Sequence, residues 1–272
     1  SFSFLISPQL MANSTEPAVP EQTKISLEEM ATRYLDVLQK NYDMVCFTLA
    51  GSRQLNESDY DEFSQQLQVM PRQPARMEFE KAKFASEQWL LRNSLADGLA
   101  LVMPVLEDAR TICALCDFKA SGSRDQVELQ KIATTNRAEF LQTEISKKFE
   151  VLAEKYNVTC EVTPHILSLM EVTKALMAKD GILTEEESED GAKRTVKIRS
   201  VQIVQSPETN SVGGSSLNLT RRVGDSEKVI KVGDQIHFTK AEHIGSLLTI
   251  GIFITDILRG IQQYAQATGA AD

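Results

Sequence analysis

Residues 79–120 read FEKAKFASEQWLLRNSLADGLALVMPVLEDARTICALCDFKA, and the rest of the chain is best understood from this stretch. Its apolar residues recur at steps of three, four and seven, which is the spacing of a helix that faces a core. This stripe consists of Phe84, Leu91, Leu95, Leu99, Val102, Leu106, Ala109, Cys113 and Cys116. Pro104 lacks an amide N–H and clashes with the preceding turn. The pattern therefore predicts a long core helix with a kink or break near Pro104.

Helical patterns also precede and follow this stretch. Ser26 and Glu29 form a capping box, in which each side chain can accept the other's backbone N–H. The helix that they open carries the stripe Leu27, Ala31, Tyr34, Leu38, Val45 and Leu49. Residues 125–157 are again helical, in two pieces, and a further helix runs from Thr163-Pro164 to Gly181. We therefore predict a disordered lead-in over residues 1–24 and a helical domain over residues 25–182.

The helical period disappears after an acidic run at residues 185–190, which we place in a solvated loop over residues 183–192. Residues 193–239 instead alternate β-branched and polar residues, as in a small antiparallel β insertion. Gly224-Asp225 and Gly233-Asp234 are typical turn dipeptides and predict three or four strands. The alternation slips near Ser200, where we expect a bulge.

Residues 240–268 return to a helical pattern that is apolar on almost every side. Its large apolar residues are Ile244, Leu247, Leu248, Ile250, Ile252, Phe253, Ile254, Ile257, Leu258 and Ile261. Such a helix must be enclosed, and the uncharged run of residues 244–255 is shorter than the ~20 residues of a membrane span. The predicted fold is mainly α: a multi-helix bundle with a small antiparallel β insertion before a buried C-terminal helix, and no membrane span.

Charge is unevenly distributed along the 272 residues, whose formal net charge is −9. Residues 191–242 hold nine Lys or Arg against five Asp or Glu, which leaves +4 there and −13 on the remainder. The acidic total argues against general nucleic-acid binding, which requires clustered cations, and fits a cytoplasmic protein. A basic interaction surface on the insertion would use Lys193, Arg194, Lys197, Arg199, Arg221 and Arg222.

No motif in the chain indicates a metal or a cofactor. Cys113 and Cys116 have the CxxC spacing but fall on the apolar stripe, which indicates buried thiols rather than a redox pair or a zinc site. A metal site formed by His237, Glu242 and His243 is conceivable, but we expect these residues to have no metal-binding role. Phosphate loops, nucleophile elbows and HExxH motifs are absent from the sequence.

A short cluster of polar residues interrupts the apolar pattern of the long helix and is a candidate ligand site. Arg92 and Asn93 follow Trp89-Leu90-Leu91, and Asp97 comes one turn later. These residues either face solvent or line a polar pocket, in which Arg92 pairs with Asp97 or Asp256 and binds an anionic ligand.

The Arg92-Asn93 pair within a long bundle helix resembles the HEPN superfamily of helical nucleotide- and RNA-processing domains. The ribonuclease signature of that family is an Arg, usually followed by a polar residue, with a His four to six positions later. No His occurs between Asn93 and Gly98, so the resemblance covers one helix and implies no complete ribonuclease site.

Two functions from different classes fit these patterns. The first is a non-catalytic protein that binds a protein partner or forms a homo-oligomer, because no catalytic set converges and the charge is asymmetric. The second is a helical-bundle enzyme or ligand-binding domain of the HEPN-like kind, with a site near Arg92, Asn93 and Asp97. We favour the non-catalytic function.

Overall fold

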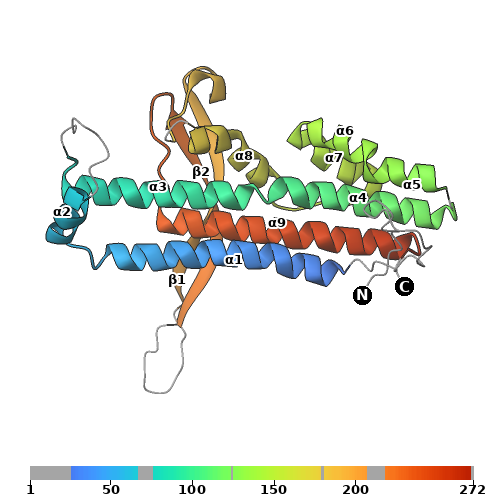
Figure 1. Cartoon of the computed structure of the whole chain (residues 1–272), viewed down its shortest axis with the longest axis horizontal. Helices are drawn as coiled ribbons and strands as arrows, with labels where there is room; N and C mark the ends of the chain where they lie inside the picture. Colours follow the sequence, from blue (N-terminus) through green and yellow to red (C-terminus); the bar gives the residue numbers. More distant parts are fainter. Residues whose placement is uncertain (1–25, 67–75, 124, 179–180, 207–217, 271–272) are drawn as a thin grey trace. The chain divides into compact units, whose positions relative to one another are not determined.

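The computed structural model describes residues 26–66, 76–123, 125–178, 181–206 and 218–270 (Figure 1). The predicted lead-in over residues 1–24 lies outside the described residues. Within them the fold is mainly α, with one small antiparallel sheet before a C-terminal helix, as predicted. The elements in chain order are α1 (Leu27–Ser52), α2 (Glu57–Gln66), α3 (Phe79–Leu99), α4 (Val102–Ala120), α5 (Gln126–Ala133), α6 (Thr135–Gln142), α7 (Ile145–Tyr156), α8 (Thr163–Ala178), β1 (Lys193–Ser206), β2 (Asn218–Lys231) and α9 (Lys240–Ala267).

The long core stripe is confirmed, and so is the break near Pro104. The helix ends at Leu99 and restarts at Val102, where the missing N–H of proline weakens the ladder. Phe84 is the exception, because it is exposed near the start of α3 and packs against the His237 ring with centroids 5.4 Å apart. All the other stripe residues are buried. Residues 125–157 form three helices rather than two pieces, with breaks at Thr134 and Thr143.

The described chain forms two compact units. Unit 1 consists of the described parts of residues 1–37, 101–163 and 251–272, and unit 2 of residues 38–100 and 164–250. In unit 1, α4, α7 and the second half of α9 share a core, in which Phe149 meets Phe253 edge to face. Gly260 lets Val158 approach the backbone of α9, since a Cβ there would lie 2.8 Å from Val158 Cγ1.

Unit 2 packs the second half of α1 and the first half of α9 against α3. Gly98 on α3 is the meeting point, because a Cβ there would touch Leu38, Leu247 and Ile250 at 3.1–3.5 Å. Asn41 adds a polar tie by donating from Nδ2 to the Ser94 carbonyl at 2.7 Å. The side chain of Gln88 pairs with both backbone groups of Phe238, at 3.0 and 2.9 Å, and so fixes the chain just before α9.

The β insertion of unit 2 is a two-stranded hairpin, not the three or four strands that we predicted. Its register runs without interruption from Lys193 opposite Lys231 to Ser206 opposite Asn218, so the expected bulge at Ser200 is absent from these strands. Gly224 lies inside β2 opposite Ser200 rather than in a turn. Gly233 does form the predicted turn, with φ +87°.

The hairpin crosses α9 at one position where only glycine fits. A Cβ on Gly245 would collide with the carbonyl group of Arg199 and with the Ser200 backbone. Beside this crossing, Val196 and Ile198 of β1 are buried. The backbone N–H of Lys197 donates to Ser168 Oγ of α8 at 2.9 Å, so α8 covers part of the β1 edge.

The C-terminal helix is enclosed as predicted. Leu247, Ile250, Phe253, Ile254, Ile257, Leu258 and Ile261 are buried. By length and composition α9 could cross a membrane, but 61% of its most apolar window is buried within the described chain, and the core helices of water-soluble proteins satisfy the same criterion. The acidic run before the hairpin is less solvated than predicted, because Glu187 is buried and its carboxylate accepts from the Thr184 N–H and hydroxyl.

Candidate docking groove in unit 2

The structure does not bring the predicted ligand residues together. Arg92 is only 4% exposed, and its side chain packs against Gly181, where a Cβ would lie 2.6 Å from Arg92 Cδ. Asp97 is exposed on a different face of α3. Asn93 donates to the Trp89 carbonyl of its own helix at 2.7 Å. This arrangement makes Arg92 a support for the loop after α8 rather than the wall of an open pocket.

Asp256, the other predicted partner of Arg92, belongs to unit 1. Its carboxylate accepts from Arg259 at 3.1 Å and lies 3.7 Å from the sulfur of Cys160. Both partners lie within unit 1, and together with burial the nearby carboxylate raises the pKa of the Cys160 thiol to about 11.

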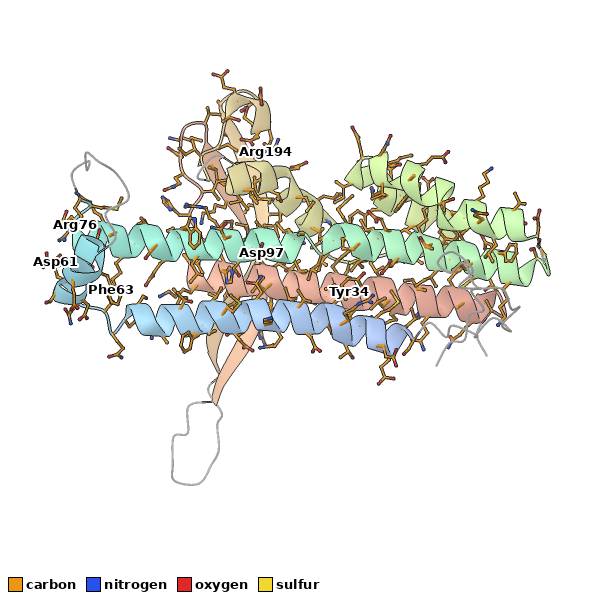
Figure 2. All side chains as sticks on the ribbon, viewed as in Figure 1. Tyr34, Asp61, Phe63, Arg76, Asp97 and Arg194 are labelled. Carbon is orange, nitrogen blue, oxygen red and sulfur yellow. The ribbon has the colours of Figure 1, made fainter. Side chains whose placement is uncertain are left out.

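Among the described cations predicted to form a basic surface, Arg194 and Arg199 form ion pairs. Arg194 pairs with Glu171 and also donates to the Glu187 carbonyl, and Arg199 pairs with Asp225 at 3.0 Å. Lys193, Lys197 and Arg222 remain exposed, while the side chain of Arg221 lies outside the description. In Figure 2, Arg194 and Asp97 lie on separate parts of unit 2. The predicted basic surface is therefore distinct from the predicted ligand residues.

His243, Cys113 and Cys116 are buried, and Glu242 is held by an ion pair. Glu242 accepts from Lys228 Nζ at 2.8 Å, and His243 Nε2 lies 2.9 Å from Ser94 Oγ. Burial lowers the pKa of His243 to about 4, so its ring is neutral at pH 7. Among the described residues no cluster of three His, Cys, Asp or Glu could hold a metal. Burial raises the pKa of Cys116 to about 11 and that of Cys113 further still.

An apolar groove lies between α1 and α9 in unit 2 and was not predicted from the sequence. Its volume is about 200 Å³. Val45 and Leu49 of α1, Leu91 of α3 and Ile244 of α9 supply the apolar lining. Leu248 follows Ile244 by one helical turn and is exposed, so it extends the apolar side of α9 beyond the groove.

Two cations stand in the lining of this groove. Arg53 is exposed at the end of α1. Lys240, at the first residue of α9, pairs with Glu87 at 3.3 Å and keeps 42% of its side chain exposed. Tyr42, Cys46, Ala50 and His243 complete the lining. Cys46 is the only exposed thiol among the four cysteines. An apolar side chain flanked by a carboxylate would match this lining in both polarity and charge.

A partial signal for the groove exists in the sequence. Tyr42, Cys46, Leu49 and Arg53 follow one another at steps of three and four, which places them on one side of α1 beside the core stripe of Leu38 and Val45. That periodicity marks a second apolar stripe on α1 but does not reveal whether another element covers it. The groove depends on α9, which is about 190 residues away in sequence.

A second hollow lies in unit 1 between the start of α1 and α9. Its volume is about 380 Å³, but its lining is mixed in polarity and Arg259, its cation, already pairs with Asp256. The lining residues are Ser26, Leu27, Glu28, Ala31, Thr255, Leu258, Arg259 and Gln262. It offers no apolar floor comparable to that of the groove.

No protein-family description, curated protein or solved structure matches this chain.

Proposed function

We propose that the chain is a non-catalytic protein-interaction protein, and that the groove between α1 and α9 docks an apolar segment of a protein. The observation that carries this proposal is a groove in which Leu49 and Ile244 are half-buried, Val45 and Leu91 form a buried apolar floor, and Arg53 and Lys240 lie beside them. Exposed apolar surface of this kind, rimmed by polar residues, is typical of interaction sites.

The chemistry of the groove supports binding rather than catalysis. His243 is the one imidazole among the lining residues, and its Nε2 lies 2.9 Å from Ser94 Oγ. A general base needs a free nitrogen within hydrogen-bond reach of a substrate. The net charge of −9 disfavours nucleic acid as a partner, so we propose a protein partner or a homo-oligomer in the cytoplasm.

The alternative function, ligand binding or catalysis near Arg92, Asn93 and Asp97, has less support. Arg92 is buried behind the loop at Gly181, whereas Asp97 faces solvent. No acid–base pair joins these residues.

Site-specific photo-crosslinking tests the proposed function. Cys46 lines the groove and is exposed, so a benzophenone maleimide attached there reports what enters the groove in native lysate. The matched control carries the probe in unit 1 through Val127→Cys in a Cys46→Ser background, since Val127 is also exposed. We expect one defined protein, or the chain itself, to crosslink from residue 46 and not from residue 127. Equal labelling from both positions would contradict the proposal.

A further inference from the structure

One helix of unit 2 presents an apolar side chain that matches the groove. The acidic helix α2 reads ESDYDEFSQQ, and its Phe63 is 63% exposed. Glu57 and Glu62 on the same helix are also exposed. A single aromatic anchor with adjacent carboxylates is therefore displayed to solvent, although exposing a phenylalanine costs free energy.

Contacts made by residues near Phe63 hold α2 in place. The Tyr60 ring lies 5.9 Å from the Phe79 ring, and the Arg76 guanidinium stacks over Tyr60 at 4.9 Å. Arg76 also pairs with Asp61, and Figure 2 shows Asp61, Phe63 and Arg76 together at α2. Asn56 and Asp59 cap the helix reciprocally at 3.1 Å. These ties fix α2 while leaving Phe63 outside them.

The groove and α2 are complementary in polarity and in charge. The groove offers an apolar floor with Arg53 and Lys240, whereas α2 offers Phe63 with carboxylates and contains no Lys or Arg. In its own chain Phe63 stays exposed, so α2 does not fill the groove of the same copy. Resting on the proposed function, we propose that the partner is a second copy of this chain, in which Phe63 of α2 enters the groove beside Arg53.

Two copies can make this contact twice. Because each copy carries both the anchor and the groove, a twofold axis pairs α2 of each copy with the groove of the other, and the assembly closes as a dimer. Each contact is small compared with the ~800 Å² per partner of standard interfaces. We therefore expect a dissociation constant on the order of micromolar.

Sedimentation equilibrium of the full chain, from low to several hundred micromolar, measures the association. Phe63→Ser removes the anchor and should weaken it by at least about tenfold, because aromatic anchors dominate interface energies. Val127→Ser is the matched control, since it removes an apolar residue of unit 1 that is also largely exposed, and it should leave association unchanged. Circular dichroism verifies that each variant folds.

A charge exchange gives the sharper test. Arg53→Glu and Glu62→Arg should each weaken self-association through like-charge contacts, yet an equimolar mixture of the two variants should associate, because both contacts in the mixed dimer then join opposite charges. A chain that is monomeric at every concentration would overturn this inference, as would a mixture that associates no better than either variant alone.

The failure of this inference and that of the proposed function can be told apart. Ala50→Trp fills the groove from an exposed position of α1. If Ala50→Trp abolishes crosslinking from Cys46 to a different protein while Phe63→Ser changes nothing, the groove is a docking site and α2 is not its occupant. If neither variant affects any association, both proposals fall.

Discussion

The burial of His243 predicts that the stability of unit 2 depends on pH. His243 sits in the floor of the groove beside Ser94 and is neutral because burial lowers its pKa from 6.5 to about 4. The unfolded chain binds a proton at this residue below pH 6.5, whereas the folded chain does not until about pH 4. The free energy of unfolding is therefore unaffected by protonation of His243 above pH 6.5, and it falls as the pH drops from 6.5 toward 4, because the unfolded chain then binds a proton that the folded chain does not.

Chemical denaturation of wild type and His243→Gln at two pH values tests this residue. Between pH 7 and pH 4.5 we expect the unfolding free energy of the wild type to fall by about 2 kcal/mol more than that of the variant. Other acid-sensitive groups contribute equally to both proteins and cancel in the difference. Identical pH dependence would show that His243 does not carry this proton linkage.

The close contact between Gly245 and the backbone of β1 gives a second prediction. Because a Cβ at this position would collide with the Arg199 carbonyl, Gly245→Ala should destabilise unit 2 by about 2–4 kcal/mol through displacement of the hairpin or α9. Gly51→Ala, in α1, is the matched control, because no atom lies within 4 Å of the added Cβ and alanine favours a helix. Thermal unfolding should show opposite signs for the two variants, and equal shifts would contradict the close crossing.

At the scale of elements, periodicity predicted the helices because burial imposes a 3.6-residue repeat that tertiary contacts reinforce. The same reasoning failed where the signal was local. Gly224-Asp225 is a turn dipeptide, yet the pairing of Val223 with Val201 and of Asp225 with Arg199 keeps it within β2. Phe84 fits the core stripe but lies too close to the start of α3 to be covered. A sequence pattern shows which side of a helix is apolar, but not where the covering element ends.

The connection between α3 and the segment before α9 depends on one side chain. Gln88 is buried and makes both hydrogen bonds to the Phe238 backbone. Gln88→Ala should leave a buried N–H and C=O unsatisfied and cost about 2–4 kcal/mol, measured by urea denaturation. Gln39→Ala, which removes an exposed hydrogen bond to Asp43 on α1, should cost less than about 0.5 kcal/mol. Comparable losses would mean that Gln88 is not an anchor.

The groove could not be predicted as readily as the helices that line it. The second stripe on α1 is legible in the sequence, but only the structure places Leu91 and Ile244 beside it. The residues chosen from sequence for chemistry, Arg92, Asn93 and Asp97, were selected because they interrupt an apolar pattern. Such interruptions arise equally from a buried support such as Arg92 and from a solvent-facing residue such as Asp97.

For the molecule as a whole, we propose that the chain associates through unit 2. The thiols provide a direct readout, because Cys46 is exposed while Cys113 and Cys116 are buried and Cys160 has a raised pKa. At high dilution a disulfide reagent should modify one thiol quickly and the others slowly. Cys46→Ser should abolish the fast phase. If the fast phase persisted in that variant, the exposed thiol would not be the one that lines the groove.

The rate of Cys46 modification as a function of protein concentration shows whether a second copy fills the groove. If a second copy fills the groove, the rate should fall as the concentration rises through the dissociation constant, and Phe63→Ser should restore the fast rate at every concentration. A rate that is independent of concentration in the wild-type chain would mean that no second copy covers Cys46.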